Sequence, residues 1–160
     1  RMFLPEIRFC GPDDVPAIIE ANGLSLYPWP DAVIARDLAA SSLEQTREDL
    51  SYLGAFSRGS GARLLGYAVM GHEAGFALLM GLMVLPRYRR RGIGTQLVLA
   101  VAECARSMGR TRLILRVGEA NAPARALYEG LSFRRGATRA RYYSDGENAV
   151  EMVLLLHRAL

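Results

Sequence analysis

A run of arginines and glycines in the middle of the chain has the residue types that bind phosphate groups. This arginine–glycine loop comprises Arg89, Arg90, Arg91, Gly92, Ile93, Gly94 and Thr95. A nearly continuous apolar segment, residues 76–84, precedes it, and an amphipathic pattern that ends at Gly109 follows it. Glycine lets the backbone approach a ligand closely, and the amides at a helix N-terminus attract anions. The spacing predicts a phosphate site where a buried strand gives way to a helix, with a solvated run of charge as the alternative.

The residue types missing from the arginine–glycine loop exclude or disfavour some classes of phosphate ligand. All 20 basic residues are arginine, so no lysine is available for a Gly-Lys-Ser/Thr phosphate loop or for a Schiff base. A dinucleotide site needs a third small residue for helix packing, and position 97 is leucine, although Glu119 downstream fits that class. The pyrophosphate of coenzyme A fits the shorter pattern Arg-x-x-Gly-x-Gly. The sequence therefore favours coenzyme A.

The elements that must hold this loop alternate between strands and helices. Apolar runs and alternation predict strands near residues 6–10, 50–57, 63–70, 76–84, 113–117, 133–143 and 150–156. Helical spacing predicts helices over residues 15–22 and 32–40, a third that ends at Gly109, and a short fourth that Asn121 caps. No linker or repeat interrupts this order. We therefore expect residues 1–160 to form a single mixed α/β domain.

Two segments resemble the signature motifs of the GNAT N-acetyltransferase superfamily. Residues 82–95 resemble its acetyl-CoA motif, and residues 121–133 resemble its second motif, NxxAxxLYxxxGF, with Ser132 where glycine is usual. Pro28-Trp29 and Arg141-Tyr142-Tyr143 resemble the peptide-binding loops of one subgroup, the ribosomal-protein alanine N-acetyltransferases. The resemblance implies a single mixed, mostly antiparallel sheet of six to seven strands with a central splayed parallel pair, flanked by about four helices.

The resemblance also implies which residues bind acetyl-CoA. The arginine–glycine loop would take the pyrophosphate, and Asn121 would hydrogen-bond the pantetheine arm. Tyr128 would sit beside the thioester sulfur, where a phenol with a pKa of about 10 can give a proton to the departing thiolate. A plain helix N-cap at Asn121 and a packed aromatic at Tyr128 are the structural alternatives. Backbone groups at the end of the buried strand would pair with the pantetheine and acetyl groups; these belong to Leu82, Met83 and Val84.

The general base is where the chain departs from the pattern. Arg116 occupies the position at which the subgroup has a glutamate, and the buried strand has no carboxylate, with Glu73 just outside it. Glu119 is the nearest substitute, although it could equally be a loop carboxylate. Because an α-amine has a pKa of about 8 and a lysine side chain about 10.4, an unassisted reaction favours a peptide N-terminus. We therefore expect direct attack by the amine, with water or Glu119 taking the proton.

Four aromatic residues are candidates for the acceptor groove. Tyr27 and Trp29 lie in a proline-rich loop, and Tyr142 and Tyr143 lie in the predicted strand 133–143. Neighbours on a strand face opposite sides, so one of the two tyrosines would line the groove and the other would be core. A role for all four as core or hinge aromatics is the alternative.

These observations predict an acetyl-CoA-dependent N-acetyltransferase that acts on a protein N-terminus, with that of a ribosomal protein as one candidate. The alternatives are an acetyltransferase for a small amine (an amino acid, polyamine or antibiotic) and a non-catalytic acyl-CoA-binding domain. A nucleic-acid-binding module is disfavoured because the arginines cluster at one loop and one hairpin rather than along a helix face.

The charge of the chain is unevenly distributed. Residues 1–80 contain six arginines and ten acidic residues, whereas residues 81–160 contain 14 arginines and six acidic residues. Because residues 12–49 hold eight of the acids, we expect a cationic acceptor on that side.

Cys10 and Cys104 are expected to be buried, reduced thiols. With no metal-ligand spacing, no signal peptide and no membrane segment, we expect a cytoplasmic monomer or homodimer without metal.

Overall fold

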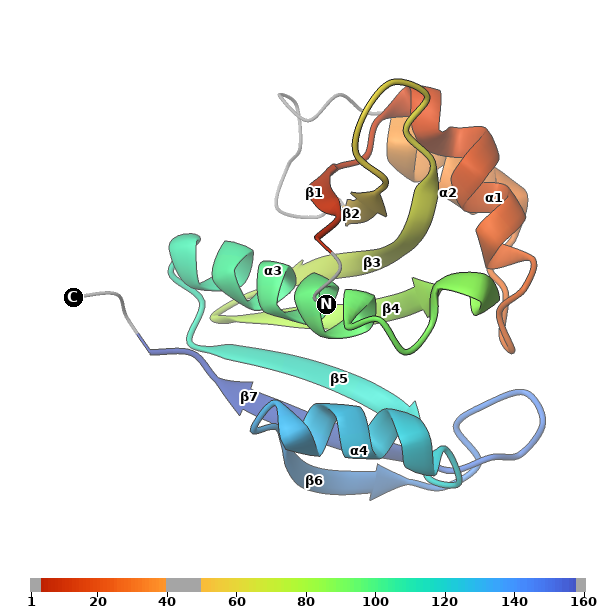
Figure 1. Cartoon of the computed structure of the whole chain (residues 1–160). Coiled ribbons are helices and arrows are strands. Elements are labelled where there is room, and N and C mark those ends of the chain that lie inside the picture. The colour runs from red at the N-terminus through yellow and green to blue at the C-terminus, as the bar shows by residue number, and fades with distance from the viewer. Residues whose placement is uncertain (1–3, 40–49, 158–160) are drawn as a thin grey trace.

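The computed structural model describes residues 4–39 and 50–157, which form one open sheet with helices on both faces (Figure 1). Within these ranges the sheet has seven strands in the order β1-β2-β3-β4-β5-β7-β6. The strands are β1 (Glu6–Phe9), β2 (Ser51–Phe56), β3 (Leu64–Glu73), β4 (Phe76–Val84), β5 (Arg112–Gly118), β6 (Arg134–Arg139) and β7 (Ala149–Leu155). The helices are α1 (Val15–Asn22), α2 (Asp31–Ala39), α3 (Ile93–Ser107) and α4 (Ala122–Gly130), with short 3-10 turns η1 (Pro12–Asp14) and η2 (Pro86–Tyr88). The expected sheet and helices are confirmed.

Two apolar clusters fill the two sides of the sheet. On one side Leu97, Val98 and Val101 of α3 recur at helical spacing and are fully buried against β3, β4 and β5. On the other side Ile18 of α1 and Ile34 of α2 are fully buried against β2 and β3. Figure 1 shows α3 and α4 on the near side of the sheet. The arginine–glycine loop joins β4 to α3, so it stands at the carboxyl end of the central strand pair.

β4 and β5 are parallel neighbours for only part of their length. Their pairing begins with Phe76 opposite Arg112 and ends with Leu79 opposite Leu115. Beyond these pairs the carboxyl ends of the two strands point apart, as Figure 1 shows. The strands therefore leave a gap between them at the end that carries the arginine–glycine loop, and this is the splay that the family resemblance implied.

A β-bulge at Met80 accompanies the separation. Against β3, Leu79 pairs with Met70 and Gly81 pairs with Val69, so Met80 has no partner in the register. A bulge bends its strand and increases the local twist, and a shift of one residue exchanges the faces to which side chains point. Leu82 and Val84 accordingly pack with the α3 cluster, and Met83 packs with the α1–α2 cluster.

The predicted strand 133–143 is too long. β6 ends at Arg139, and Arg141 has a φ of 52°, in the left-handed region, which turns the chain out of the sheet. Tyr142 and Tyr143 therefore lie in the β6–β7 loop and not on a strand. Their rings meet edge to face at 5.0 Å between centroids rather than facing opposite sides.

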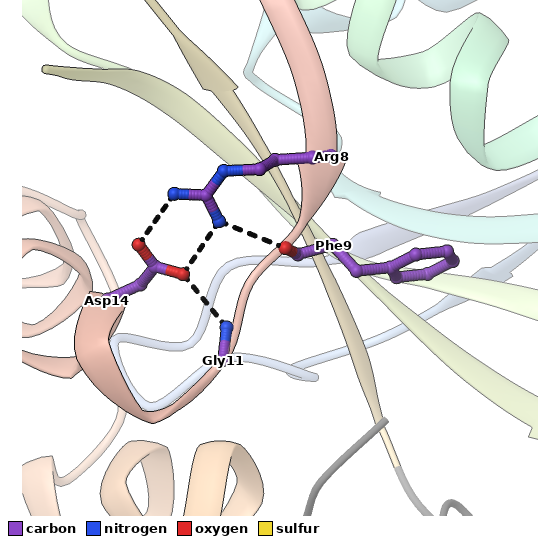
Figure 2. A network of polar contacts seen from close by, with 4 residues as sticks. All are labelled: Arg8, Phe9, Gly11 and Asp14. Atoms are coloured by element: carbon purple, nitrogen blue, oxygen red, sulfur yellow. Dashed lines mark hydrogen bonds and ion pairs between the residues drawn. The ribbon is translucent and has the colours of Figure 1, made fainter. Parts of the chain in front are cut away.

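The start of α1 is tied to β1 by a polar network (Figure 2). Two Arg8 nitrogens donate to the Asp14 carboxylate at 2.9 and 3.1 Å, and the Gly11 amide donates to the same carboxylate at 2.8 Å. Arg8 also donates to the Phe9 carbonyl at 3.1 Å. The hydrogen bonds from Arg8 hold the pKa of Asp14 below its usual range. Asp14 is one of the acids expected to attract a cationic acceptor, but its carboxylate is engaged by Arg8 and Gly11 within the fold.

Candidate active site

The arginine–glycine loop turns the chain sharply before α3. Arg90 and Gly92 have φ angles of 63° and 79°, in the left-handed region, which costs about 1 kcal/mol for a residue with a Cβ. Left-handed residues in a loop direct successive N–H groups to one side, an arrangement that binds anions. No side chain caps the helix at Gly92, and Gln96 N–H donates to the Gly92 carbonyl at 3.1 Å. The amides of residues 93–95 therefore point out of the helix, as predicted for a pyrophosphate site.

Arginine side chains brace the same loop. Arg89 Nε donates to the Val84 carbonyl at 3.0 Å, which ties the loop to the end of β4. This carbonyl is one of the backbone groups that the family resemblance assigned to the pantetheine and acetyl groups. Arg87 and Arg91 lie over the ring of Tyr88, with their Cζ atoms 5.5 and 5.8 Å from its centroid. The loop therefore concentrates positive charge around the helix N-terminus.

Gly94 faces the gap between β4 and α4. A Cβ at this position would lie 3.6 Å from Val84 Cγ2, 3.8 Å from Leu127 Cδ2 and 4.0 Å from Leu82 Cδ2. These are ordinary van der Waals distances, so the fold itself would tolerate a methyl group there. The space that this methyl would fill is bordered by the end of β4, the N-terminus of α3 and α4.

Asn121 and Tyr128 lie on α4, which borders the same gap. Asn121 caps the helix by accepting the Ala124 N–H at 3.3 Å, and this use of its oxygen leaves its amide nitrogen for a ligand. Tyr128 is buried among the α3 cluster and meets Phe133 edge to face at 5.6 Å. Burial raises the pKa of Tyr128 to about 12, so its phenol stays protonated at neutral pH. Asn121 is therefore a helix N-cap and Tyr128 a packed aromatic, as the structural alternatives expected. The Asn121 amide nitrogen and the Tyr128 hydroxyl remain as polar groups that could contact a ligand.

An aromatic stack connects the two halves of the sheet at the open end of the splay. Tyr27, in the α1–α2 loop, stacks on Tyr143 of the β6–β7 loop with 4.4 Å between centroids and an interplanar angle of 7°. The Tyr27 hydroxyl donates to Asp145 at 2.8 Å, and the Tyr143 hydroxyl donates to the Arg116 carbonyl at 3.4 Å. We call this arrangement the tyrosine bridge. It joins the α1–α2 loop to β5 and to the β6–β7 loop, where Tyr27 and Asp145 are 118 positions apart in the sequence.

Trp29 is held over β4 on the face opposite α3. The Asn22 side-chain amide makes two hydrogen bonds to the Trp29 backbone. It accepts from the Trp29 N–H at 3.1 Å and donates to the Trp29 carbonyl at 2.8 Å. The indole lies 3.6 Å from where a Cβ of Gly81 would be, just past the Met80 bulge. Asn22 and Asp145 are site-supporting residues that the sequence analysis missed. Asn22 is 4% exposed, and a buried asparagine needs a partner for its amide, which the Trp29 backbone supplies.

The two charged residues singled out near the base position have defined partners. Glu119 forms an ion pair of 3.5 Å with Arg135 of β6, on the side of β5 that faces away from β4. Arg116 forms an ion pair of 3.6 Å with Glu151, its cross-strand neighbour on β7. The Arg116 guanidinium lies 5.8 Å from the centroid of the Tyr142 ring. Arg116 therefore borders two of the four candidate acceptor aromatics, Tyr142 and Tyr143, whereas Glu119 is turned toward β6.

Other reactive groups are few in the described ranges. Cys10 is buried and Cys104 is half-buried at the surface of α3, so the expectation of a buried Cys104 is only partly right. Burial raises the pKa of both thiols, that of Cys10 to about 12. Residues 4–39 and 50–157 contain no group of three or more potential metal ligands. No helix in this part of the chain has the length and apolarity needed to cross a membrane.

The comparison with protein families agrees with this geometry. A family model described as "Acetyltransferase (GNAT) family" matches residues 17–133, which include α3, α4 and both ends of the splay. The chain belongs to the GNAT acetyltransferase family. The resemblance inferred from the two motifs is thereby confirmed, and so is the expectation of an acetyltransferase family with acetyl-CoA as its acyl donor.

Relatives of this GNAT chain are named as N-acetyltransferases. The [ribosomal protein bS18]-alanine N-acetyltransferase of Escherichia coli K12 is 34% identical over 131 residues, covering 80% of this chain and 81% of the relative. The crystal structure of the Escherichia coli ribosomal-protein-S18-alanine N-acetyltransferase superposes with a TM-score of 0.79 at 27% identity, covering 98% and 97% of the two chains. An N-alpha-acetyltransferase of Saccharolobus solfataricus is 37% identical over 75 residues. That match covers 46% of this GNAT chain and 45% of the archaeal protein, so the alignment spans less than half of that relative.

The departure from the second GNAT motif has a structural meaning. Ser132 has a φ of 74°, in the left-handed region that glycine adopts without strain. Its N–H donates to the Glu129 carbonyl at 3.0 Å as the chain leaves α4. The serine therefore adopts the backbone conformation that explains why glycine is usual here, at a cost of about 1 kcal/mol.

Proposed function

We propose that this protein transfers the acetyl group of acetyl-CoA to the α-amine of a protein N-terminus. The observation that carries the proposal is the splay between β4 and β5, which opens beside an anion-binding helix N-terminus and under a set of aromatic residues. The names of the bacterial and archaeal relatives support the same reaction. Acetyl-CoA supplies the thioester carbonyl that the acceptor amine attacks.

The acyl-donor side is formed by residues of β4, α3 and α4. In this proposal the amides at the start of α3 and the arginine–glycine loop bind the pyrophosphate. The glycine at position 94 leaves room for the pantetheine arm, and the Asn121 amide nitrogen hydrogen-bonds it. Leu82 and Met83 provide backbone groups at the splayed end of β4, since the Val84 carbonyl is held by Arg89.

Tyr128 is the proposed proton donor to the departing sulfur. Its raised pKa keeps it neutral, and a buried phenol next to a developing thiolate makes a charge-assisted hydrogen bond. We propose that the acceptor arrives as the neutral α-amine and that water takes the proton it releases. The position of Glu119 supports water as the proton acceptor, because its carboxylate forms an ion pair with Arg135 and is turned toward β6.

The acceptor side is formed by Trp29, Tyr142 and the tyrosine bridge. We propose that an N-terminal segment, such as that of a ribosomal protein, enters between the α1–α2 and β6–β7 loops and places its amine in the splay. The protein would then work in the cytoplasm as a single-domain monomer or homodimer, where acetyl-CoA and newly made protein N-termini are both present.

The direct test is release of free coenzyme A from acetyl-CoA with a panel of acceptors. The panel contains an Ala-initiated peptide, the same peptide with an acetylated N-terminus and an internal lysine, free alanine, and spermidine. We expect turnover with the free N-terminus and none with the blocked peptide, together with a mass increase of one acetyl group at the terminal residue. Turnover confined to spermidine or free alanine would replace this proposal with a small-amine acetyltransferase.

A further inference from the structure

A charged cluster on the acceptor side of the sheet has no role in the chemistry described so far. It consists of Arg116 on β5, Glu151 on β7 and Arg139 on β6, three neighbouring strands. Arg116 and Glu151 are direct cross-strand partners. Leu113, Leu115 and Val117 of β5 point to the α3 cluster, so Arg116 points to the opposite face. We call these three residues the Arg116 cluster.

The cluster holds more positive charge than it neutralises. Glu151 Oε2 lies 3.6 Å from Arg116 Nε and 3.9 Å from an Arg139 terminal nitrogen, so one carboxylate oxygen serves two guanidinium groups. Both distances exceed those of a good hydrogen bond. Arg116 Nε is buried and has no hydrogen-bond partner among the described residues. The cluster therefore carries a net positive charge, and the Arg116 side chain, which is 29% exposed, is accessible to a second carboxylate.

The position of the cluster places this positive charge where the splay opens. Arg116 directly follows Leu115, the last β5 residue that pairs with β4, so it stands where the splay opens. Its carbonyl accepts the Tyr143 hydroxyl, and its guanidinium lies beside the Tyr142 ring. A peptide whose amine occupies the splay would bring its next residues past this point, because an extended chain advances about 3.3 Å per residue.

Four acids of the β6–β7 loop and of the α1–α2 side are already engaged. Asp145 accepts the Tyr27 hydroxyl at 2.8 Å and the Glu147 amide at 3.0 Å, and Glu147 accepts the Ala120 amide at 2.8 Å. On the α1–α2 side, Asp14 is held by Arg8 and Asp37 accepts the Tyr52 hydroxyl at 2.9 Å. The expected attraction of a cationic acceptor thus finds little unengaged negative charge among these residues, and the acids at positions 44, 48 and 49 lie outside the described ranges.

We infer that Arg116, assisted by Arg139, binds a carboxylate of the acceptor and selects N-termini with an acidic side chain at the second or third residue. The inference rests on the proposed function and specifies its substrate class. A guanidinium binds a carboxylate through two parallel hydrogen bonds, and such pairs are the strongest polar contacts available to an exposed peptide. An acetyltransferase with a glutamate at position 116 would repel the same peptide.

The test uses peptides that begin with alanine and differ only at residues two and three, which are glutamate, glutamine or arginine. The expected kcat/KM is about tenfold higher for the glutamate peptide than for the glutamine peptide, the contribution of one charge-assisted hydrogen bond. In Arg116→Gln the ratio should fall to about one, and Arg139→Gln, at an exposed site, should reduce it without disturbing the sheet. Arg112→Gln is the matched control, because Arg112 lies on the same face of the same strand at its far end.

The outcomes separate this inference from the proposed function. Equal rates for the three peptides, a preference for arginine, or loss of the preference in Arg112→Gln would overturn the inference while N-terminal acetylation stands. No turnover of any peptide would overturn the proposed function itself. A third outcome would be faster turnover of free alanine than of alanine amide, with the difference lost in Arg116→Gln. That result would overturn the selection of acidic side chains and show that the Arg116 cluster binds the main-chain carboxylate of an amino acid.

Discussion

Replacing Gly94 with alanine should raise the stability of the protein and lower its affinity for acetyl-CoA. The nearest atoms to the new methyl are Val84 Cγ2 at 3.6 Å, Leu127 Cδ2 at 3.8 Å and Leu82 Cδ2 at 4.0 Å, so nothing in the fold must move. Gly94 is the second residue of α3, and alanine in a helix is favoured over glycine by about 0.5–1 kcal/mol. For a domain of this size that gain raises Tm by about 2 °C.

The same methyl occupies the space assigned to the pantetheine arm. Overfilling a packed space by one methylene costs about 1–3 kcal/mol, which corresponds to roughly a 5- to 150-fold increase in the KM for acetyl-CoA. Thermal unfolding without ligand and titration calorimetry with coenzyme A measure the two effects separately. Gly130→Ala is the control, because Gly130 ends α4 with no atom within 4 Å of an added methyl and should change stability without changing affinity. Unchanged affinity in Gly94→Ala would refute the placement of the arm.

Four further perturbations probe the catalytic groups and the strained turn. Tyr128→Phe should lower kcat on the order of 100-fold with little change in the KM for acetyl-CoA, as steady-state kinetics will show, because it removes only a proton donor. Glu119→Gln should leave the pH–rate profile unchanged, and a shifted basic limb would return Glu119 to the mechanism. Ser132→Gly should raise the free energy of unfolding in urea by about 1 kcal/mol, because it relieves a φ of 74°. Burial raises the pKa values of Tyr67 and Tyr128 to about 12. The folded state therefore holds protons that the unfolded state loses above about pH 10, so stability measured by urea unfolding should fall between about pH 10 and pH 12, by up to about 1.4 kcal/mol per pH unit for each phenol. The Cys10 thiol, whose pKa is also raised to about 12, should start this fall near pH 9.

The helices and strands were predictable because their signals are local. Apolar periodicity located α3. The N-cap residue Asn121, followed by Pro123 in the first helical turn, located the start of α4. The splayed pair came from the family resemblance and not from periodicity. A left-handed residue such as Arg141 leaves no pattern in the sequence, so the predicted strand ran to residue 143 although β6 ends at Arg139.

The candidate site was predictable on the donor side and only partly on the acceptor side. The donor site is one continuous motif, whereas the tyrosine bridge joins Tyr27 to Asp145 across 118 positions of sequence. Cross-strand register decides that Arg116 meets Glu151, and register depends on the whole sheet. One local signal was available, since Glu151 is the sole charged residue in the apolar run 149–155 and such a residue needs a partner.

The tyrosine bridge has a mechanical consequence. The two halves of the sheet are joined at one end of the gap by the β4–β5 pairs and at the other end by the Tyr27–Tyr143 stack. A gap fastened at one end is a hinge, whereas a gap fastened at both ends is a frame of fixed width. A frame requires no closing motion before reaction, and its closed rim admits the end of a chain more readily than a loop that must enter doubled. Under the proposed function, an opening of this shape would favour chain termini over internal side chains, before any proton or charge is involved.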